Sequence, residues 1–240
     1  MDSLKISVII PALNEELYLP KTIENVFLNA EDPKNLEVLV VDAGSSDSTM
    51  QAIEKLDVRM FSKPEFALKK YQSLNYGIEQ STGEILLFLD ADTTLPKAFD
   101  KHIRKTLEDK KMVGGAFEFS FEKPDWKLYL LQMINRIRYR IEQMYYGDQA
   151  VFCRRSAAEK IGGYPEKTLM ESAFFCSQLL KVGQLKLIKE PIKTSARRFN
   201  EKGFFKVFWF DFTMWIRFVL NLPVEDYGKK YWELNLKSDG

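Results

Sequence analysis

The fold of this chain is decided by one stretch, residues 84–96, which reads EILLFLDADTTLP. Its apolar run from Ile85 to Leu89 predicts a buried strand, which ends in two carboxylates, Asp90 and Asp92. Ligands of open α/β sheets bind beyond the carboxyl ends of the strands, and residues two apart on an extended chain point the same way. The pair therefore suits one hard divalent cation that bridges to a diphosphate, and a solvated acidic turn is the plain alternative.

Strand and helix patterns alternate four times over the first half of the chain. The expected elements are strand 5–12, helix 15–28, strand 36–41, helix 49–56, strand 58–61, helix 67–80, strand 85–89 and helix 96–110. This alternation predicts a parallel, doubly wound α/β sheet with right-handed crossovers. The second half is less regular, with expected strands 112–121, 150–154 and 184–189 and expected helices 125–145 and 169–182.

Composition narrows the class of protein. The 240 residues are 45% hydrophobic, which is ample for one α/β domain with a short extension. A formal net charge of +1 gives no global field that would favour nucleic acid. Cys153 and Cys176 lie far apart in the sequence and do not have the spacing of a zinc site. We therefore expect no disulfide, and we expect a cytoplasmic location.

Acidic residues follow three of the predicted parallel strands. Glu15, Asp42 and the Asp90/Asp92 pair should converge on one crevice, because the carboxyl ends of parallel strands meet at one edge of the sheet. A nucleotide bound there would use Asp42 for its base or ribose, Asp90 for the ribose or a metal-bound water, and Asp92 for the metal. Capping and turn formation are the structural alternative for such residues.

Three motifs in this order give the chain a family resemblance. The stretches ISVIIPALNEE, VLVVDAGSSDST and LNYGIEQSTGEILLFLDADTTLP resemble the nucleotide-binding half of family 2 glycosyltransferases, which have the GT-A fold. The likeness covers about residues 5–110, and the pieces YGDQAVFCRR, GGYPEKTLMES and TSARRF, similar to those of a bacterial subgroup, extend it to about residue 200. We therefore expect a GT-A domain over 1–200, with a nucleotide-binding half 1–110 and an acceptor half 111–200, followed by an aromatic helical extension 201–240.

The resemblance implies a hexosyl-transferring enzyme that uses a nucleoside-diphosphate sugar, Mg²⁺ or Mn²⁺ on Asp90 and Asp92, and usually inversion at the anomeric carbon. It implies a hydroxyl acceptor, either lipid or glycan. By the same comparison Asp42 contacts the base or ribose, and Lys69 or Lys70 lies near the donor. The remaining donor-contacting positions that it implies are Pro11, Ala12, Asn14, Glu15, Asn75, Asp90 and Ala91.

The acceptor half departs from the family pattern. Many members carry Glu-Asp at the start of a helix, with the Asp as general base, whereas this chain has Glu171-Ser172. A serine hydroxyl does not readily take a proton at neutral pH without a base beside it. Glu171 is the first candidate for the base, Asp148 is the second, and a weakened or lost activity is the third alternative. One of the arginines Arg197 and Arg198 is expected to stabilise the leaving diphosphate, with an ion pair or a surface position as the alternative.

Residues 204–222 read FFKVFWFDFTMWIRFVLNL, which has the length of a membrane span. The charges of Lys206, Asp211 and Arg217 make a true span the last choice. Packing in the core or in an oligomer comes first, and a helix on the inner face of a membrane comes second.

Two alternatives to the enzyme stay open at this point. A binding module would keep the nucleotide fold and lose catalysis together with the second acid of Glu-Asp. A nucleotidyltransferase would use a related sheet, but Pro11-Ala12-Leu13-Asn14 stands where its glycine-rich phosphate loop is expected. The missing G-x-G-x-x-G after the first strand disfavours a Rossmann oxidoreductase.

Overall fold

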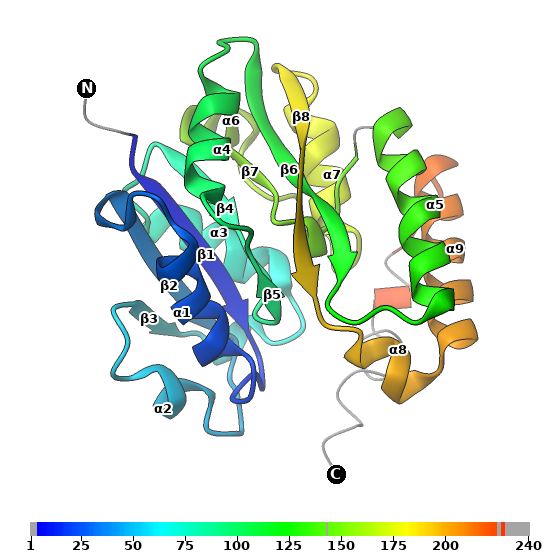
Figure 1. Ribbon diagram of the computed structural model, residues 1–240, viewed down its shortest axis with the longest axis horizontal. Helices are drawn as coiled ribbons and strands as arrows, with labels where there is room; N and C mark the ends of the chain where they lie inside the picture. Colours follow the sequence, from blue (N-terminus) through cyan, green and yellow to red (C-terminus); the bar gives the residue numbers. More distant parts are fainter. Residues whose placement is uncertain (1–3, 143, 225–226, 229–240) are drawn as a thin grey trace.

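The computed structural model describes residues 4–142, 144–224 and 227–228 (Figure 1). Its centre is one sheet of eight strands. The strands are β1 (Ile6–Ala12), β2 (Leu36–Asp42), β3 (Arg59–Ser62), β4 (Ile85–Phe88), β5 (Thr93–Thr94), β6 (Met112–Phe121), β7 (Phe152–Arg154) and β8 (Gln184–Thr194).

Helices connect and cover the strands. The α-helices are α1 (Leu19–Asn29), α2 (Thr49–Ile53), α3 (Lys70–Gln80), α4 (Phe99–Leu107), α5 (Trp126–Glu142), α6 (Arg155–Ile161), α7 (Glu171–Leu179), α8 (Arg197–Lys202) and α9 (Phe204–Val219). Short 3₁₀ turns are η1 (Pro33–Asn35), η2 (Pro64–Phe66) and η3 (Gly147–Gln149).

The strand order is β3-β2-β1-β4-β7-β6-β8-β5. The first four strands in this order run parallel, as the alternation of strand and helix patterns predicts. The second half joins the same sheet through β7, which runs antiparallel to both β4 and β6, while β6 and β8 are parallel to each other. The fold is therefore α/β with a mostly parallel sheet, as expected.

Two hydrophobic clusters lie on the two faces of the sheet. Along β1, Ile6, Val8 and Ile10 belong to one cluster and Ile9 to the other, because successive side chains of a strand point to opposite faces. Helices α1 and α4 cover the first face, and α3, α6 and α7 cover the second. Burial on both faces explains why the runs in β2 and β4 are almost wholly apolar.

Several predicted boundaries are shifted, and each shift has a local cause. Helix α1 begins at Leu19 and not at Glu15, because the left-handed backbone of Asn14 (φ 56°) turns the chain and Pro20 lies in the first helical turn. Helix α3 begins at Lys70, after η2 and a left-handed Leu68 (φ 62°). Strand β8 continues past Lys189 to Thr194, because its pairing with β6 shifts register beside Pro191 and then resumes.

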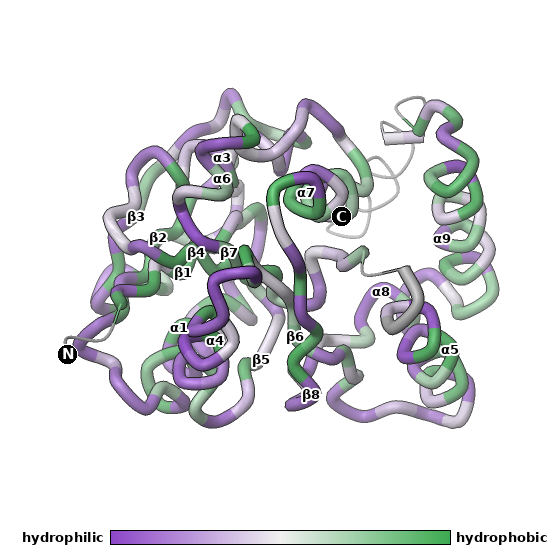
Figure 2. Tube along the Cα trace, turned by 90° about the horizontal axis from the view of Figure 1, so that it is seen from above, coloured by the Kyte–Doolittle hydropathy of each residue, from purple (hydrophilic) through white to green (hydrophobic). Residues whose placement is uncertain are grey.

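The aromatic segment forms α9, which lies with α5 at the end of the molecule remote from β3 (Figures 1 and 2). Val207, Met214 and Phe218 are buried, and much of the rest of the helix is exposed. The core-packing interpretation therefore applies to one side of α9 only. Among the described residues, no helix combines the length and the apolar character needed to cross a bilayer. Residues 225–226 and 229–240 of the expected extension lie outside the described residues.

Candidate active site

The acidic residues at the strand ends converge as the parallel topology requires. Strands β2, β1 and β4 are neighbours in the sheet, so the chain segments that follow them emerge at one edge. The charges of Asp92 and Asp90 both act on the pKa of Glu15, which is consistent with three carboxylates in one cluster. Asp42 ends β2, where it pairs in register with Ala12 of β1.

Asn14 holds the first two loops together. Its backbone N–H donates a hydrogen bond to Ser45 Oγ (2.8 Å), and its Oδ1 accepts one from the Ser46 backbone N–H (2.8 Å). Its left-handed backbone is unusual for a residue other than glycine, although Asn tolerates it best. Asn14 thus sets the path of the loop that carries Glu15, next to Pro11 and Ala12 at the end of β1.

Asp42 is buried and organises its own turn. It accepts hydrogen bonds from the backbone N–H groups of Gly44 (3.1 Å) and Ser45 (3.1 Å) and from the Ser45 hydroxyl. This is the turn-forming role that short acidic side chains often take after a strand. The structure places Asp42 at the expected edge, with both of its oxygens already used by the loop.

Lys70 connects the metal-site candidate to the base candidate. Its Nζ lies 2.5 Å from Asp90 Oδ1 and 3.7 Å from Glu171 Oε1. All three side chains are largely buried, so water screens this network less than it would screen a surface pair. Glu171 is the first residue of α7, and the residue before it, Met170, has a left-handed backbone (φ 59°). Such backbone strain concentrates at functional sites.

Arg197 connects the first strand end to the Asp-x-Asp turn. Its two terminal nitrogens donate to the two carboxylate oxygens of Glu15 (2.9 and 2.5 Å), and its Nε lies 3.4 Å from Asp92 Oδ2. The guanidinium also lies 4.8 Å from the centre of the Tyr18 ring. Burial alone would lower the pKa of Arg197, but the hydrogen bonds and the charge of Glu15, together with the charge of Asp92, raise it.

Arg198, the next residue, pairs with α9 and not with the carboxylates that Arg197 contacts. It forms an ion pair with Asp211 of α9, about half of whose side chain is exposed. Asp148, in η3, lies on the same side, and the charges of Asp90, Arg198 and Asp211 all act on its pKa. Asp148 Oδ1 is shielded from solvent and has no hydrogen-bond partner within the described part of the chain.

Burial governs the protonation of the site carboxylates. It raises the pKa of Asp148 to about 7, and the nearby charge of Asp90 adds to the effect. Burial also raises the pKa values of Glu15, Asp92 and Glu171. The positive charges of Arg197 and Lys70 partly offset these increases, so the cations keep the carboxylates more acidic than burial alone would.

Two residues expected at the donor have other surroundings. The side chain of Asn75 exchanges two hydrogen bonds with the backbone of Tyr164 (2.9 and 2.7 Å), so it fastens α3 to the loop after α6. Lys69 is exposed just before α3, and Lys70 supplies the cation of the cluster. Ala91 is buried, and its carbonyl accepts a hydrogen bond from Thr22 of α1 (2.7 Å), which fixes the turn between the two aspartates.

Sequence reasoning did not assign a role to Gly147. A Cβ atom there would lie 2.9 Å from Lys70 Nζ and 3.3 Å from Asp90 Oδ2, so a side chain at this position would intrude on the cluster. The only sequence signal for this close approach is the glycine itself, one residue before Asp148 in YGDQ. Ser172 is also informative, because it is buried and its hydroxyl does not readily take a proton at neutral pH.

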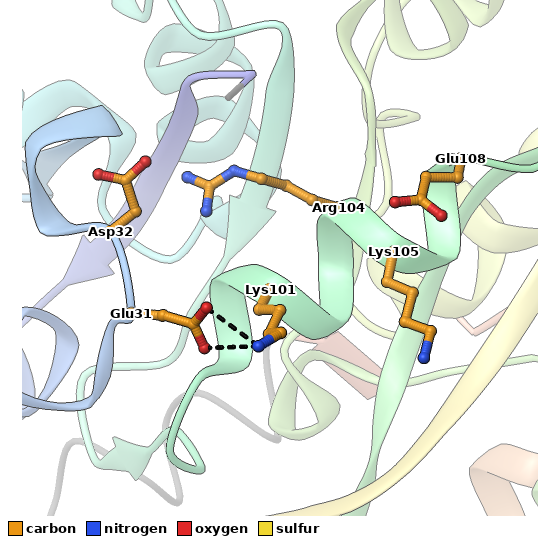
Figure 3. A pocket seen from close by; sticks show the side chains of 6 residues that line it. All are labelled: Glu31, Asp32, Lys101, Arg104, Lys105 and Glu108. Atoms are coloured by element: carbon orange, nitrogen blue, oxygen red, sulfur yellow. Dashed lines mark hydrogen bonds and ion pairs between the residues drawn. The ribbon is translucent and has the colours of Figure 1, made fainter. Parts of the chain in front are cut away.

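The hollow drawn in Figure 3 is a different place. It lies between the end of α1 and helix α4, at the edge of the sheet where the strands begin, and is lined by Glu31, Asp32, Lys101, Arg104, Lys105 and Glu108. The buried Asp100 accepts hydrogen bonds from the backbone N–H groups of Glu31 and Asp32 and from Arg104. These bonds close the loop after α1, so the hollow reflects structural ion pairing.

The donor atoms at Asp90 and Asp92 suit a hard divalent cation. Carboxylate oxygens are the ligands that Mg²⁺ and Mn²⁺ prefer, and Mg²⁺ often takes only one or two of them from the protein. Within residues 4–142, 144–224 and 227–228, no three acidic, histidine or cysteine side chains form a ready metal cage. A cation at this pair would complete its coordination with phosphate oxygens and water.

Comparison with known proteins finds a family whose sequence model matches more than half of this chain. The family model described as "Glycosyl transferase family 2" matches residues 7–161. "Probable glycosyltransferase YdaM" of Bacillus subtilis is 27% identical, over 89% of this chain and 54% of the relative. A "GalNAc(5)-diNAcBac-PP-undecaprenol beta-1,3-glucosyltransferase" of Campylobacter jejuni is 32% identical, over 38% of this chain and 30% of the relative. The chain thus spans about half the length, or less, of these relatives.

Solved structures share the fold. The mannosyltransferase PcManGT of Pyrobaculum calidifontis, solved with GDP-Man and Mn²⁺, superimposes with a TM-score of 0.61 at 22% identity, covering 78% of this chain and 55% of that protein. Staphylococcus aureus TarS 1–349 with UDP gives a TM-score of 0.57 at 20% identity, covering 78% and 58%. At this level of identity the likeness concerns the fold.

Proposed function

The chain belongs to glycosyl transferase family 2, and on that premise we propose that it transfers a sugar from a nucleoside-diphosphate sugar to an acceptor hydroxyl, with inversion. The observation that carries this proposal is the cluster at the carboxyl ends of β1, β2 and β4. There Asp90, Asp92 and Glu15 lie with two cations, Lys70 and Arg197. Carboxylates for a metal and cations for phosphate oxygens are the groups that a sugar nucleotide requires.

Each charged residue has a task in this proposal. Asp90 and Asp92 would hold a divalent cation, which would stabilise the negative charge of the departing nucleoside diphosphate. Arg197 presents a planar guanidinium that suits phosphate oxygens, and Glu15 keeps it oriented through two hydrogen bonds. Lys70 supplies a second positive charge between Asp90 and Glu171.

The acceptor hydroxyl would attack the anomeric carbon as the bond from that carbon to the diphosphate oxygen breaks. The hydroxyl proton goes to a carboxylate of this chain, and the nucleoside diphosphate leaves with the bonding electrons. Glu171 is the first candidate for this base, because Lys70 joins it directly to Asp90. Asp148 is the second, because its pKa of about 7 suits proton uptake near neutral pH.

A thermal-shift panel tests the donor assignment. The full chain would be heated with UDP, GDP, ADP or CDP, each with and without Mn²⁺, and compared with the variants Asp92→Ala and Asp57→Asn. Stabilisation by one nucleoside diphosphate that requires Mn²⁺ and disappears only in Asp92→Ala supports the proposal. No stabilisation by any nucleotide with Mn²⁺ would refute it.

Ser172 favours one alternative, a nucleotide-sugar-binding module that has lost transfer. In that case calorimetry would show donor binding with metal, and neither hydrolysis nor transfer of the sugar would follow.

The acceptor class is also part of the proposal: a lipid-linked or glycan hydroxyl, since the Campylobacter relative is named for an undecaprenol-linked substrate. For residues 204–222, two partners stay open here, a membrane surface and a second copy of the chain.

A further inference from the structure

Helix α5 exposes a continuous apolar ridge that the sequence analysis did not single out. Six of its residues are between 38% and 73% exposed: Trp126, Tyr129, Leu130, Met133, Ile134 and Ile137. They recur at the three- and four-residue spacing that places side chains on one face of a helix. Leu128 and Tyr139 point the other way and are buried in the core. The helix is thus apolar on the face turned to solvent as well as on the face turned to the protein.

Helix α9 has the same character. Its exposed apolar residues, between 37% and 64% exposed, include Phe205, Trp209, Phe212, Val219 and the adjoining Leu220. Together with the α5 ridge they form what we call the α5–α9 face. Soluble proteins rarely expose contiguous apolar surface of this extent unless it contacts a partner or a membrane.

The two helices meet at their N-terminal ends, so the two exposed ridges adjoin there. Lys127 Nζ of α5 lies 5.4 Å from the centre of the Phe205 ring and 6.0 Å from that of Phe204, both on α9. In both views the helices lie at the same end of the molecule, and hydrophobic residues colour much of α9 there (Figures 1 and 2). Their N-terminal ends are therefore adjacent, with Lys127 between the aromatic rings.

Positive charge gathers on the segments that form this face. Residues 122–142 and 197–222 contain ten basic and five acidic side chains, a net charge of +5, whereas the whole chain carries +1. Partial burial lowers the pKa of Lys202, the positive charges of Arg198, Lys206 and Arg197 lower it further, and the charge of Glu201 opposes them. Lys123 and Lys206 are exposed.

We propose that the α5–α9 face binds the surface of an anionic lipid bilayer. Exposed Trp, Tyr and Phe beside lysines are the composition of helices that lie at a membrane interface, where apolar side chains enter the acyl boundary and cations meet lipid phosphates. A second copy fits less well, because it would bring an equally positive region against this one, whereas an anionic bilayer offers the opposite charge. The inference goes beyond sugar transfer and does not depend on it.

Vesicle flotation of the full chain tests this proposal without any activity measurement. Vesicles of phosphatidylcholine with phosphatidylglycerol should carry the protein upward, and vesicles of phosphatidylcholine alone should carry much less. The double variant Leu130→Gln/Ile134→Gln should lower the partition coefficient about tenfold or more, since two apolar contacts with the acyl boundary are lost. The matched double variant Leu28→Gln/Met60→Gln, which changes exposed apolar residues of α1 and β3, should bind as the unchanged protein does.

Charge reversal gives a second and independent test. Lys123→Glu/Lys206→Glu should weaken flotation on anionic vesicles about tenfold, whereas Lys34→Glu/Lys55→Glu at remote exposed positions should weaken it clearly less. Failure to float on anionic vesicles, or an equal loss in the control variants, would overturn the proposal. A dimer seen by light scattering that Leu130→Gln/Ile134→Gln converts to monomer would also overturn it, in favour of a second copy.

Discussion

The proposed donor side and the proposed acceptor side of the sheet treat their polar groups in opposite ways. On the donor side, Glu15 is held by Arg197, Asp90 by Lys70, and Asp42 by the backbone of its own turn. On the acceptor side, Asp148 Oδ1 has no hydrogen-bond partner among the described residues, and α5 and α9 turn apolar side chains to solvent. The difference teaches that the chain itself holds the carboxylates of the proposed donor cluster in place, whereas the proposed acceptor side has exposed surfaces that suit a partner.

Removing the Asp92 carboxylate should have the largest effect on this contrast. Asp92→Ala should lower the rate of sugar transfer by about a thousandfold or more, because the bound cation is lost and the charge on the leaving diphosphate is then no longer neutralised. The check is turnover of the nucleotide sugar as a function of Mn²⁺ concentration, with the exposed Asp57→Asn as control. Full activity of Asp92→Ala would remove the metal assignment.

The base candidates on the acceptor side can be separated next. Glu171→Gln should lower kcat about a hundredfold or more with little change in the KM for the donor, because only proton transfer is affected. Ser172→Ala should change kcat less than about threefold, since this buried side chain has no part in the proposed reaction. If Asp148→Asn shows the large loss and Glu171→Gln does not, the two carboxylates exchange roles.

Arg197 sharpens the comparison from the donor side. Arg197→Lys keeps the charge but cannot reproduce the two parallel hydrogen bonds to Glu15, so we expect the KM for the donor to rise about tenfold. Arg198→Lys is the neighbouring comparison, because Arg198 pairs with Asp211 and should affect donor binding much less. Equal changes in the donor KM for both variants would contradict the assignment of Arg197 to the diphosphate.

Asp148 should give the smallest effect, one on stability. Burial raises its pKa in the folded protein to about 7, above the ordinary value near 4 in the unfolded chain, so the folded state binds the proton more tightly. Its contribution to the free energy of unfolding is therefore greatest below about pH 4 and is lost as pH rises to about 7. Asp148→Asn should remove a change of roughly 1 to 3 kcal/mol in the free energy of unfolding over this interval. Urea unfolding at a series of pH values across the same interval measures the change, and an equal pH dependence for both proteins would contradict the raised pKa of Asp148.

The sequence by itself determined the parallel half of the sheet and the position of its acidic residues. The runs in β2 and β4 are apolar because both faces are covered, and such runs end where the polar turn residues begin. Asp42, Asp90 and Asp92 follow directly from those ends, because a residue next to a strand cannot lie far from its tip. The spacing of apolar residues in α9 could also be read directly from the sequence, whereas the residues against which the helix packs could not.

Only the tertiary structure decided which cations complete the cluster. The choice of Lys70 over Lys69 depends on where α3 begins, because a shift of one residue turns a helical side chain by about 100°. The side chain of Asn75 pairs with the backbone of Tyr164, and Arg197 reaches Glu15 across 182 residues of sequence. Neither pairing has a local signal, because each depends on how the second half of the chain packs against the first. The exposed ridge of α5 was hidden for the same reason: its periodicity indicates an amphipathic helix, and only packing decides that the apolar ridge faces solvent.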